Sequence, residues 1–95
     1  MSVKILIKRK VTDESMPGLE FLLRNLRSLT IHQKGYISGE SLISVEEKNL
    51  CLVISSWKTL EDWQRWFSST ERLAIQNQID HLLGEPTHYE IYQNI

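Results

Sequence analysis

Apolar and polar residues alternate along the first segment of the chain. Val3, Ile5 and Ile7 are apolar, and they alternate with Lys4, Leu6 and Lys8. This period of two is typical of a strand with one strongly apolar face, so we expect a strand over residues 2–11. We interpret the basic run at 8–10, which ends the segment, as a solvated strand end. The alternative for this run is an anionic ligand.

The spacing of apolar residues then changes to that of a helix. The leucines recur every three or four residues, which places them on one helix face. These are Leu19, Leu22, Leu23, Leu26 and Leu29. Residues 12–15 offer N-cap side chains, and Pro17 suits a first turn. His32 lies near the carbonyl end, and Gly35 is predicted to end the helix in the left-handed conformation.

Two further strands are predicted over residues 36–45 and 50–57. The four polar residues between them, 46–49, suit an antiparallel hairpin. The second segment is almost continuously apolar from Leu50 to Ile54. Such a strand is typically covered on both faces.

The remaining residues predict two helices and a last strand. Thr59 with Asp62, and Ser68 with Glu71, match the spacing of a capping box, so we expect a helix break near residues 68–69. Gly84 followed by a proline two residues later predicts a helix end. Residues 87–92 then predict a final strand.

The predicted order β, α, β, β, α, β favours an α+β fold of the ferredoxin-like type. Its four-stranded antiparallel sheet would carry helices on one face, within one domain spanning residues 1–95. The other sheet face would remain bare. Apolar residues beyond the need of one helix layer predict that a second copy covers it, giving a homodimer. These residues are Leu6, Leu42, Leu52, Ile54 and Ile91.

Charge, cysteine content and hydropathy limit the partners that we expect for this chain. A net charge of -1 and a pI near 6.3 offer little attraction for phosphate backbones, so we expect no nucleic-acid partner. The single cysteine, Cys51, excludes an internal disulfide and a cysteine metal cluster, and it favours a reducing, cytoplasmic location. We expect no membrane partner, because no apolar run is long enough for a bilayer and no leader opens the chain.

Aromatic residues are concentrated in one stretch. All three tryptophans and Phe67 lie within residues 57–67. Trp63, Trp66 and Phe67 have the spacing that gathers side chains on one helix face. Such a concentration in a small domain predicts a pocket or an interface. Two interpretations are open: core or dimer packing, and an aromatic wall that binds a small hydrophobic or aromatic molecule.

The segment GYISGE at the second strand and the run SWKTLEDWQRWFSSTER after the third, in this order of elements, resemble the antibiotic biosynthesis monooxygenase family. The resemblance covers nearly the whole chain and implies a dimeric α+β barrel. It also implies that Trp57 and Trp66 occupy positions where the family often carries tryptophan, with Trp66 lining the substrate pocket. Family members range from cofactor-independent monooxygenases to haem-degrading enzymes.

The haem-degrading branch of that family implies an iron-ligating histidine roughly ten residues after Trp66 and an asparagine in the first strand. In this chain the asparagine position falls at Lys8 or its neighbours, and the histidine position falls at Gln76. Glutamine is a poor substitute for an imidazole ligand, so haem degradation is disfavoured. We therefore expect no cofactor and no metal.

The candidate site residues fall into two groups. The candidate catalytic residues are Trp66, Arg72, Gln76 and His32. The alternative is a solvated helix face for Arg72 and Gln76, and a surface or C-capping role for His32. The candidate substrate-pocket residues are Trp57, Trp63, Trp66, Phe67, Tyr36 and Ser38. Tyr36 and Ser38 are predicted to share one strand face with Glu40. Cys51 is interpreted as an inert packing residue.

Two functions remain open at this point. The resemblance favours a cofactor-independent monooxygenase that acts on a small aromatic or quinol-like compound. Since no unmistakable base or metal site is present, the alternative is a non-catalytic homodimer that binds a small ligand or a partner protein.

Overall fold

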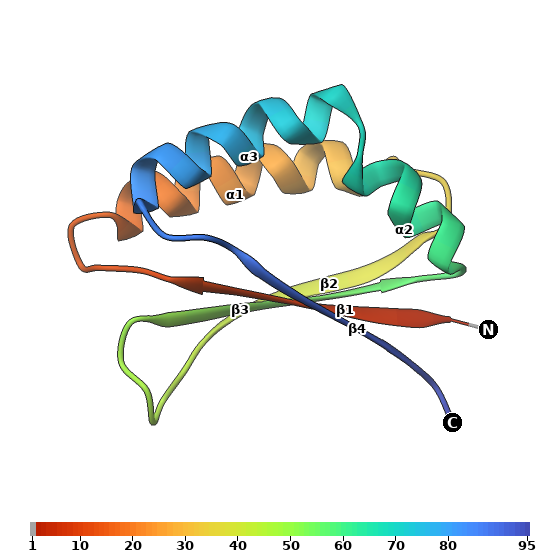
Figure 1. Cartoon of the computed structure of the whole chain (residues 1–95), viewed down its shortest axis with the longest axis horizontal. Coiled ribbons are helices and arrows are strands. Elements are labelled where there is room, and N and C mark those ends of the chain that lie inside the picture. The colour runs from red at the N-terminus through yellow and green to blue at the C-terminus, as the bar shows by residue number, and fades with distance from the viewer. Residues whose placement is uncertain (1) are drawn as a thin grey trace.

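Four strands form one antiparallel sheet, and three helices cover one of its faces, in the computed structural model of residues 2–95 (Figure 1). The strand order is β2-β3-β1-β4, which makes β1 and β3 the central strands. The elements are β1 (Val3–Lys10), α1 (Met16–Thr30), β2 (Tyr36–Ile43), β3 (Leu50–Trp57), α2 (Leu60–Phe67), α3 (Thr70–Leu83) and β4 (His88–Gln93). The predicted ferredoxin-like α+β fold is confirmed.

The alternation predicted for β1 sets which side chains face the helices. Val3, Ile5 and Ile7 are buried on the helix-covered face. β1 pairs with β3 so that Ile5 lies opposite Ser55 and Ile7 opposite Val53. Because paired residues share a face, Ser55 and Val53 face the helices as well.

The helix-free face carries most of the apolar residues predicted for it. Leu6 pairs with Ile54, and Leu42 pairs with Leu52. The prediction for Ile91 was wrong: it pairs with Ile5 and therefore belongs to the helix-side face, where the edge strand β4 leaves it 51% exposed. Within this chain only one face of β3 is covered by helices.

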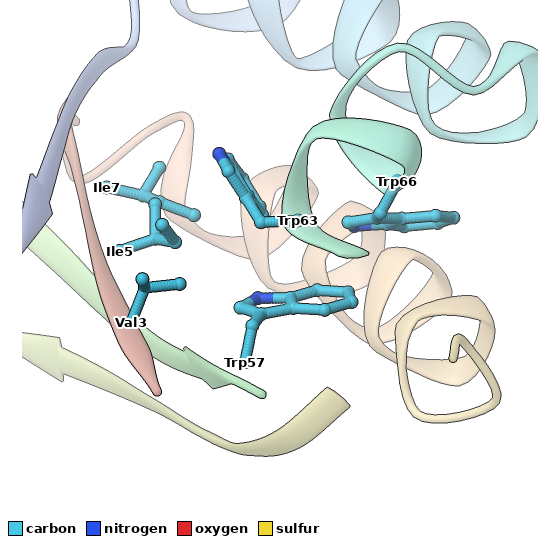
Figure 2. Close-up of a cluster of buried hydrophobic side chains, with 6 residues drawn as sticks. All are labelled: Val3, Ile5, Ile7, Trp57, Trp63 and Trp66. Atoms are coloured by element: carbon cyan, nitrogen blue, oxygen red, sulfur yellow. The ribbon is translucent and has the colours of Figure 1, made fainter. Parts of the chain in front are cut away.

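The core consists of two clusters. Leu19 and Leu22 of α1 pack with Ile79 of α3, and this cluster also includes Val11 and Cys51. The second cluster joins the aliphatic face of β1 to the three tryptophans, as Figure 2 shows. Its members are Val3, Ile5, Ile7, Trp57, Trp63 and Trp66.

The ends of the elements follow the predicted signals in part. Gly35 and Gly84 have φ of +86° and +65°, the left-handed conformation expected of them. Helix α1 nevertheless ends at Thr30, and turns occupy the residues before Gly35. The break between α2 and α3 lies where it was expected, but Ser69 rather than Ser68 caps α3 by accepting a hydrogen bond from the Arg72 N–H.

Strand β2 ends two residues earlier than predicted, and β4 begins and ends one residue later. No helix within residues 2–95 has both the length and the apolarity needed to cross a membrane.

Candidate functional site

A cavity of about 70 Å³ lies between α1, the sheet and the α2–α3 corner. A space of that size holds several water molecules or part of a small ring compound. We call it the aromatic pocket. It is lined by Ile7, Arg9, Leu23, Leu26, Arg27, Thr30, Tyr36, Gly39, Glu40, Ser41, Val53, Ser55, Trp57, Trp63, Trp66 and Arg72.

The indole rings form the wall of the aromatic pocket. Trp57 is fully buried, and its ring centroid lies 5.7 Å from that of Trp63 in an edge-to-face arrangement. Tyr36 approaches Trp57 in the same manner at 5.5 Å. Trp57 Nε1 donates to Ser55 Oγ over 3.1 Å, so this indole has both a packed ring and a satisfied donor. The structure thus brings together Tyr36 and the three predicted tryptophans.

Helix α2 carries two of these rings, and its N-terminal cap fixes where the helix begins. Thr59 Oγ1 accepts a hydrogen bond from the Asp62 N–H over 3.1 Å and fixes the helix start. Trp63 and Trp66, three residues apart, both lie on the buried face, where Figure 2 shows them above Trp57. The chain then breaks at Ser69, and α3 begins with Arg72 in its first turn.

A β-bulge separates two residues that were predicted to lie together. Tyr36 pairs with Trp57, but a shift in register between Tyr36 and Ser38 makes Ser38 pair with Ser56, on the helix-free face. The prediction that Ser38 lines the pocket was therefore wrong, because one extra residue reverses the side-chain alternation. Gly39 leaves room for Tyr36: a Cβ at position 39 would lie 2.7 Å from the tyrosine hydroxyl.

Arg72 brings a buried positive charge to the aromatic pocket. Its side chain is 3% exposed; Nη1 donates to the Phe67 carbonyl over 2.9 Å, and Nη2 donates to the Tyr89 hydroxyl. The guanidinium carbon also lies 4.4 Å from the Phe67 ring centroid. Burial lowers the pKa of Arg72, while Tyr89 opposes that effect. Since an arginine stays charged even so, Arg72 offers positive potential to a bound compound.

Gln76 lies one helical turn beyond Arg72 and is buried, but it lines a neighbouring hollow rather than the aromatic pocket. Its Nε2 donates to Asp80 Oδ1 over 2.8 Å and to Thr87 Oγ1 over 3.0 Å. A carboxylate only accepts, so these bonds direct Gln76 Oε1 toward Arg9, whose Nη2 donates to it over 3.1 Å. Gln76 is thus a positioning residue for Arg9.

Arg9 was not predicted as a site residue. It is 2% exposed and lines the aromatic pocket, so the interpretation of residues 8–10 as a solvated strand end is wrong for this residue. The signal that identifies it is the alternation of β1: position 9 continues the series of Val3, Ile5 and Ile7. Lys8 and Lys10 follow the opposite face, as an alternating strand requires.

The other candidates lie outside the aromatic pocket. His32 is exposed in the turn after α1 and lines neither hollow, so its predicted catalytic role does not fit its position. Phe67 is 39% exposed and packs on Trp63 and Tyr89 at the neighbouring hollow. Among residues 2–95 there is no group of three or more histidine, cysteine or carboxylate side chains that could hold a metal ion.

Cys51 is buried against the helix layer, as an inert packing residue would be. Burial raises the pKa of its thiol, and the nearby Arg9 only partly offsets this. A protonated, enclosed thiol is a weak nucleophile.

The neighbouring hollow has a volume of about 520 Å³ and lies between α3 and the segment leading into β4. Arg72 lines it on one side, and Gln76, Asp80 and Tyr89 are also among its lining residues. It is larger but carries fewer aromatic rings. We take the smaller aromatic pocket as the candidate ligand site because its apolar walls would enclose a compound more completely.

Acid should weaken the α2 start through Asp62. A hydrogen bond with the Thr59 side chain and then the Arg65 guanidinium hold the pKa of Asp62 below its usual range, although burial opposes them. A lowered pKa in the folded state contributes stability at neutral pH that disappears as pH falls through and below the ordinary Asp range, about pH 4. We expect Asp62→Asn to flatten the decline in urea-unfolding free energy between about pH 5 and pH 3.

The exposed Asp13→Asn is the matched control for that measurement. If Asp62→Asn showed the same acid dependence as the unmodified protein, the linkage would be refuted.

The sequence matches the model of a known family. The family described as antibiotic biosynthesis monooxygenase matches residues 2–78. No curated protein sequence matches the chain significantly.

Solved structures share the fold over nearly their whole length. A conserved protein from Methanosarcina mazei Go1 is 18% identical, with a TM-score of 0.91 over 100% of this chain and 94% of its own. Rv0793 from Mycobacterium tuberculosis is 15% identical, with a TM-score of 0.87 over 100% and 96%. SnoaB, a cofactor-independent oxygenase from Streptomyces nogalater, is 13% identical, with a TM-score of 0.86 over 99% and 93%. At these identities the likeness concerns the fold.

Proposed function

Because the chain belongs to the antibiotic biosynthesis monooxygenase family, we propose that it is a cofactor-independent monooxygenase acting on a small aromatic or quinol-like compound. The observation that carries this proposal is the aromatic pocket, where three buried indoles and Tyr36 enclose a space reached by the buried guanidinium of Arg72. One similar structure, SnoaB, is itself a cofactor-independent oxygenase.

The chemistry requires an electron-rich substrate. Oxygen accepts electrons from a phenolate or enolate far more readily than from the neutral compound, so the pocket must favour the anion. A hydroquinone and O₂ would yield a hydroxyquinone and one water: one oxygen atom joins the ring, and the other leaves with the two hydrogens removed. In this scheme Trp66 stacks on the ring, Arg72 stabilises the negative oxygen, and the apolar walls exclude water.

The test is product formation from a panel of substituted hydroquinones, incubated with the protein in air and under nitrogen. We expect an oxygen-dependent product and a loss of about tenfold in kcat/KM for Trp66→Phe, equal to about 1.4 kcal/mol of transition-state stabilisation. Phe21→Leu, on the exposed side of α1, is the control and should retain full activity. The absence of any oxygen-dependent product from the unmodified protein would refute the proposal.

A second function, the binding of a small ligand without turnover, is favoured by one specific observation. The described side chains that line the aromatic pocket include no histidine to act as a base near neutral pH. Tryptophan fluorescence titration with the same hydroquinones distinguishes the two functions. Saturable binding without product would support the second.

We further propose that the protein acts as a homodimer joined through the helix-free sheet face. The support is the apolar group Leu6, Leu42, Leu52 and Ile54, which this face carries. A second copy would bury these side chains, and each 100 Å² of apolar surface contributes roughly 2.5 kcal/mol before association costs. Sedimentation equilibrium should give twice the chain mass of 11.2 kDa, and Leu52→Glu should reduce it to the single mass.

A further inference from the structure

The buried guanidinium of Arg9 carries a further inference. The Arg9 side chain is 2% exposed and lines the aromatic pocket, and its Nε has no hydrogen-bond partner among the described residues. Buried donors in native proteins are nearly always paired, and an unpaired charged donor is costly. The environment of Arg9 is therefore incomplete in the free chain.

No described carboxylate forms an ion pair with the Arg9 guanidinium. Arg9 donates to Gln76, and Gln76 donates to Asp80, so a neutral amide stands between the cation and the nearest carboxylate on this path. The described ion pairs are Lys8 with Glu90 and Arg65 with Asp62, and neither involves Arg9. Burial accordingly lowers the pKa of Arg9.

A second buried guanidinium lies close by. Arg72 lines the same pocket, also without an ion pair among the described residues, and its charge lowers the pKa of Arg9 further. Glu40 and Arg27 line the pocket as well, but both are exposed to solvent, which screens their charges. The buried part of the pocket thus carries two positive charges without a direct negative partner.

We propose that the aromatic pocket binds a single-ring aromatic compound as its anion, with a carboxylate or phenolate oxygen directed at the Arg9 guanidinium. This proposal names the ionisation state of the substrate in the proposed function. It rests on that function only in treating the bound compound as a substrate. The indoles hold the ring, Arg9 and Arg72 supply the positive charge, and Gln76 fixes the orientation of Arg9. A buried cation without a carboxylate partner weakens the fold, and a bound anion would supply that partner.

The first experiment compares benzoate with benzamide, two rings of matched shape that differ in charge. Calorimetric titration should show benzoate binding at least tenfold more tightly at neutral pH. Arg9→Met keeps most of the buried volume but removes the charge and the planar donors. Because Arg72 remains, this substitution should remove most of the preference rather than all of it. Lys10→Met, which removes an exposed charge from the same strand, is the matched control and should keep it.

The second experiment asks whether the bound anion can be a phenolate. It uses 4-nitrophenol, whose ionisation changes its own absorbance. Bound to the unmodified protein, its pKa should fall by about one unit, which corresponds to a tenfold preference for the anion. Arg9→Met should return the pKa of the bound phenol most of the way to its free value. A preference for benzoate over benzamide without this pKa shift would assign the site to carboxylates. A pKa shift of 4-nitrophenol without a preference for benzoate would assign it to phenolates.

The inference is overturned if neither probe shows an anion preference, or if neither binds at millimolar concentration. It is also overturned if Arg9→Met keeps the preference. The thermal unfolding midpoint of the Arg9→Met variant should equal or exceed that of the unmodified protein. If Arg9 had a purely structural role, its removal would lower that midpoint. Should Arg9→Met fail to fold, Arg9→Lys serves instead: it keeps the charge, loses the planar donor set, and should reduce the preference by severalfold.

These results separate the inference from the proposed function. Neither benzoate nor 4-nitrophenol binding requires turnover. An anion preference without oxygen-dependent product from the hydroquinones would refute the monooxygenase and leave the anion site standing. Oxygen-dependent turnover without any anion preference would support the monooxygenase and refute the anion site.

Discussion

Replacing Trp57 with alanine should destabilise the domain by about 3–5 kcal/mol, the range measured when a buried large aromatic residue is truncated in a core. Trp57 is fully buried at the end of β3 and packs on Tyr36 and Trp63. Its removal opens a cavity at the junction of the sheet and α2. It also leaves Ser55 without the indole N–H that it accepts. Since small domains have total stabilities of only about 5–15 kcal/mol, this one substitution removes a large share.

Urea unfolding followed by circular dichroism measures the change in unfolding free energy. Phe21→Ala is the control: Phe21 is a large aromatic residue of α1 that is 58% exposed, so its truncation should cost less than about 1 kcal/mol. Equal losses in the two variants would show that the tryptophan cluster does not form the core that the structure describes.

Replacing Gly35 with alanine should destabilise the domain by about 2–5 kcal/mol through two separate effects. The first is backbone strain of about 1–2 kcal/mol, because Gly35 has a φ of +86° that residues with a Cβ rarely adopt. The second is a steric conflict of about 1–3 kcal/mol. A Cβ at this position would lie 2.1 Å from Asp62 Oδ2, and Asp62 belongs to the first turn of α2.

Gly84 separates the two effects. It has a similar φ of +65°, but a Cβ there meets nothing within 4 Å. Gly84→Ala should therefore show the backbone effect alone, about 1–2 kcal/mol. In the double variant Gly35→Ala with Asp62→Ala, part of the loss should be recovered because the obstructing carboxylate is gone. Equal effects of the two glycine substitutions would contradict the close packing of Gly35 against α2.

The order of the elements and the burial of the tryptophans follow from local patterns in the sequence. The leucine stripe of α1, the apolar run of β3 and the capping signals around α2 each depend on neighbouring residues only. Such signals predict the ferredoxin-like order without knowledge of the tertiary contacts. They also place Trp63 and Trp66 on one helix face, which the structure confirms.

The parts of the site that sequence reasoning missed depend on register and on tertiary environment. The bulge that separates Tyr36 from Ser38 has no residue signature, and it decides which of the two reaches the pocket. The side of Ile91 depended on how β4 pairs with β1. Arg9 was the exception, because the alternation of β1 already placed it inward, and only the basic neighbours on either side suggested solvent.

The central position of β1 in the sheet has a consequence for synthesis on the ribosome. β1 precedes the other three strands of the sheet in the sequence, yet one of its edges is paired only by β4, which is the last of the four in sequence order. Tyr89, the hydrogen-bond partner of Arg72, lies in that same strand. The edge of β1 that pairs with β4 therefore stays unpaired until β4 has been synthesised, which makes a chaperone contact with that edge advantageous during the interval.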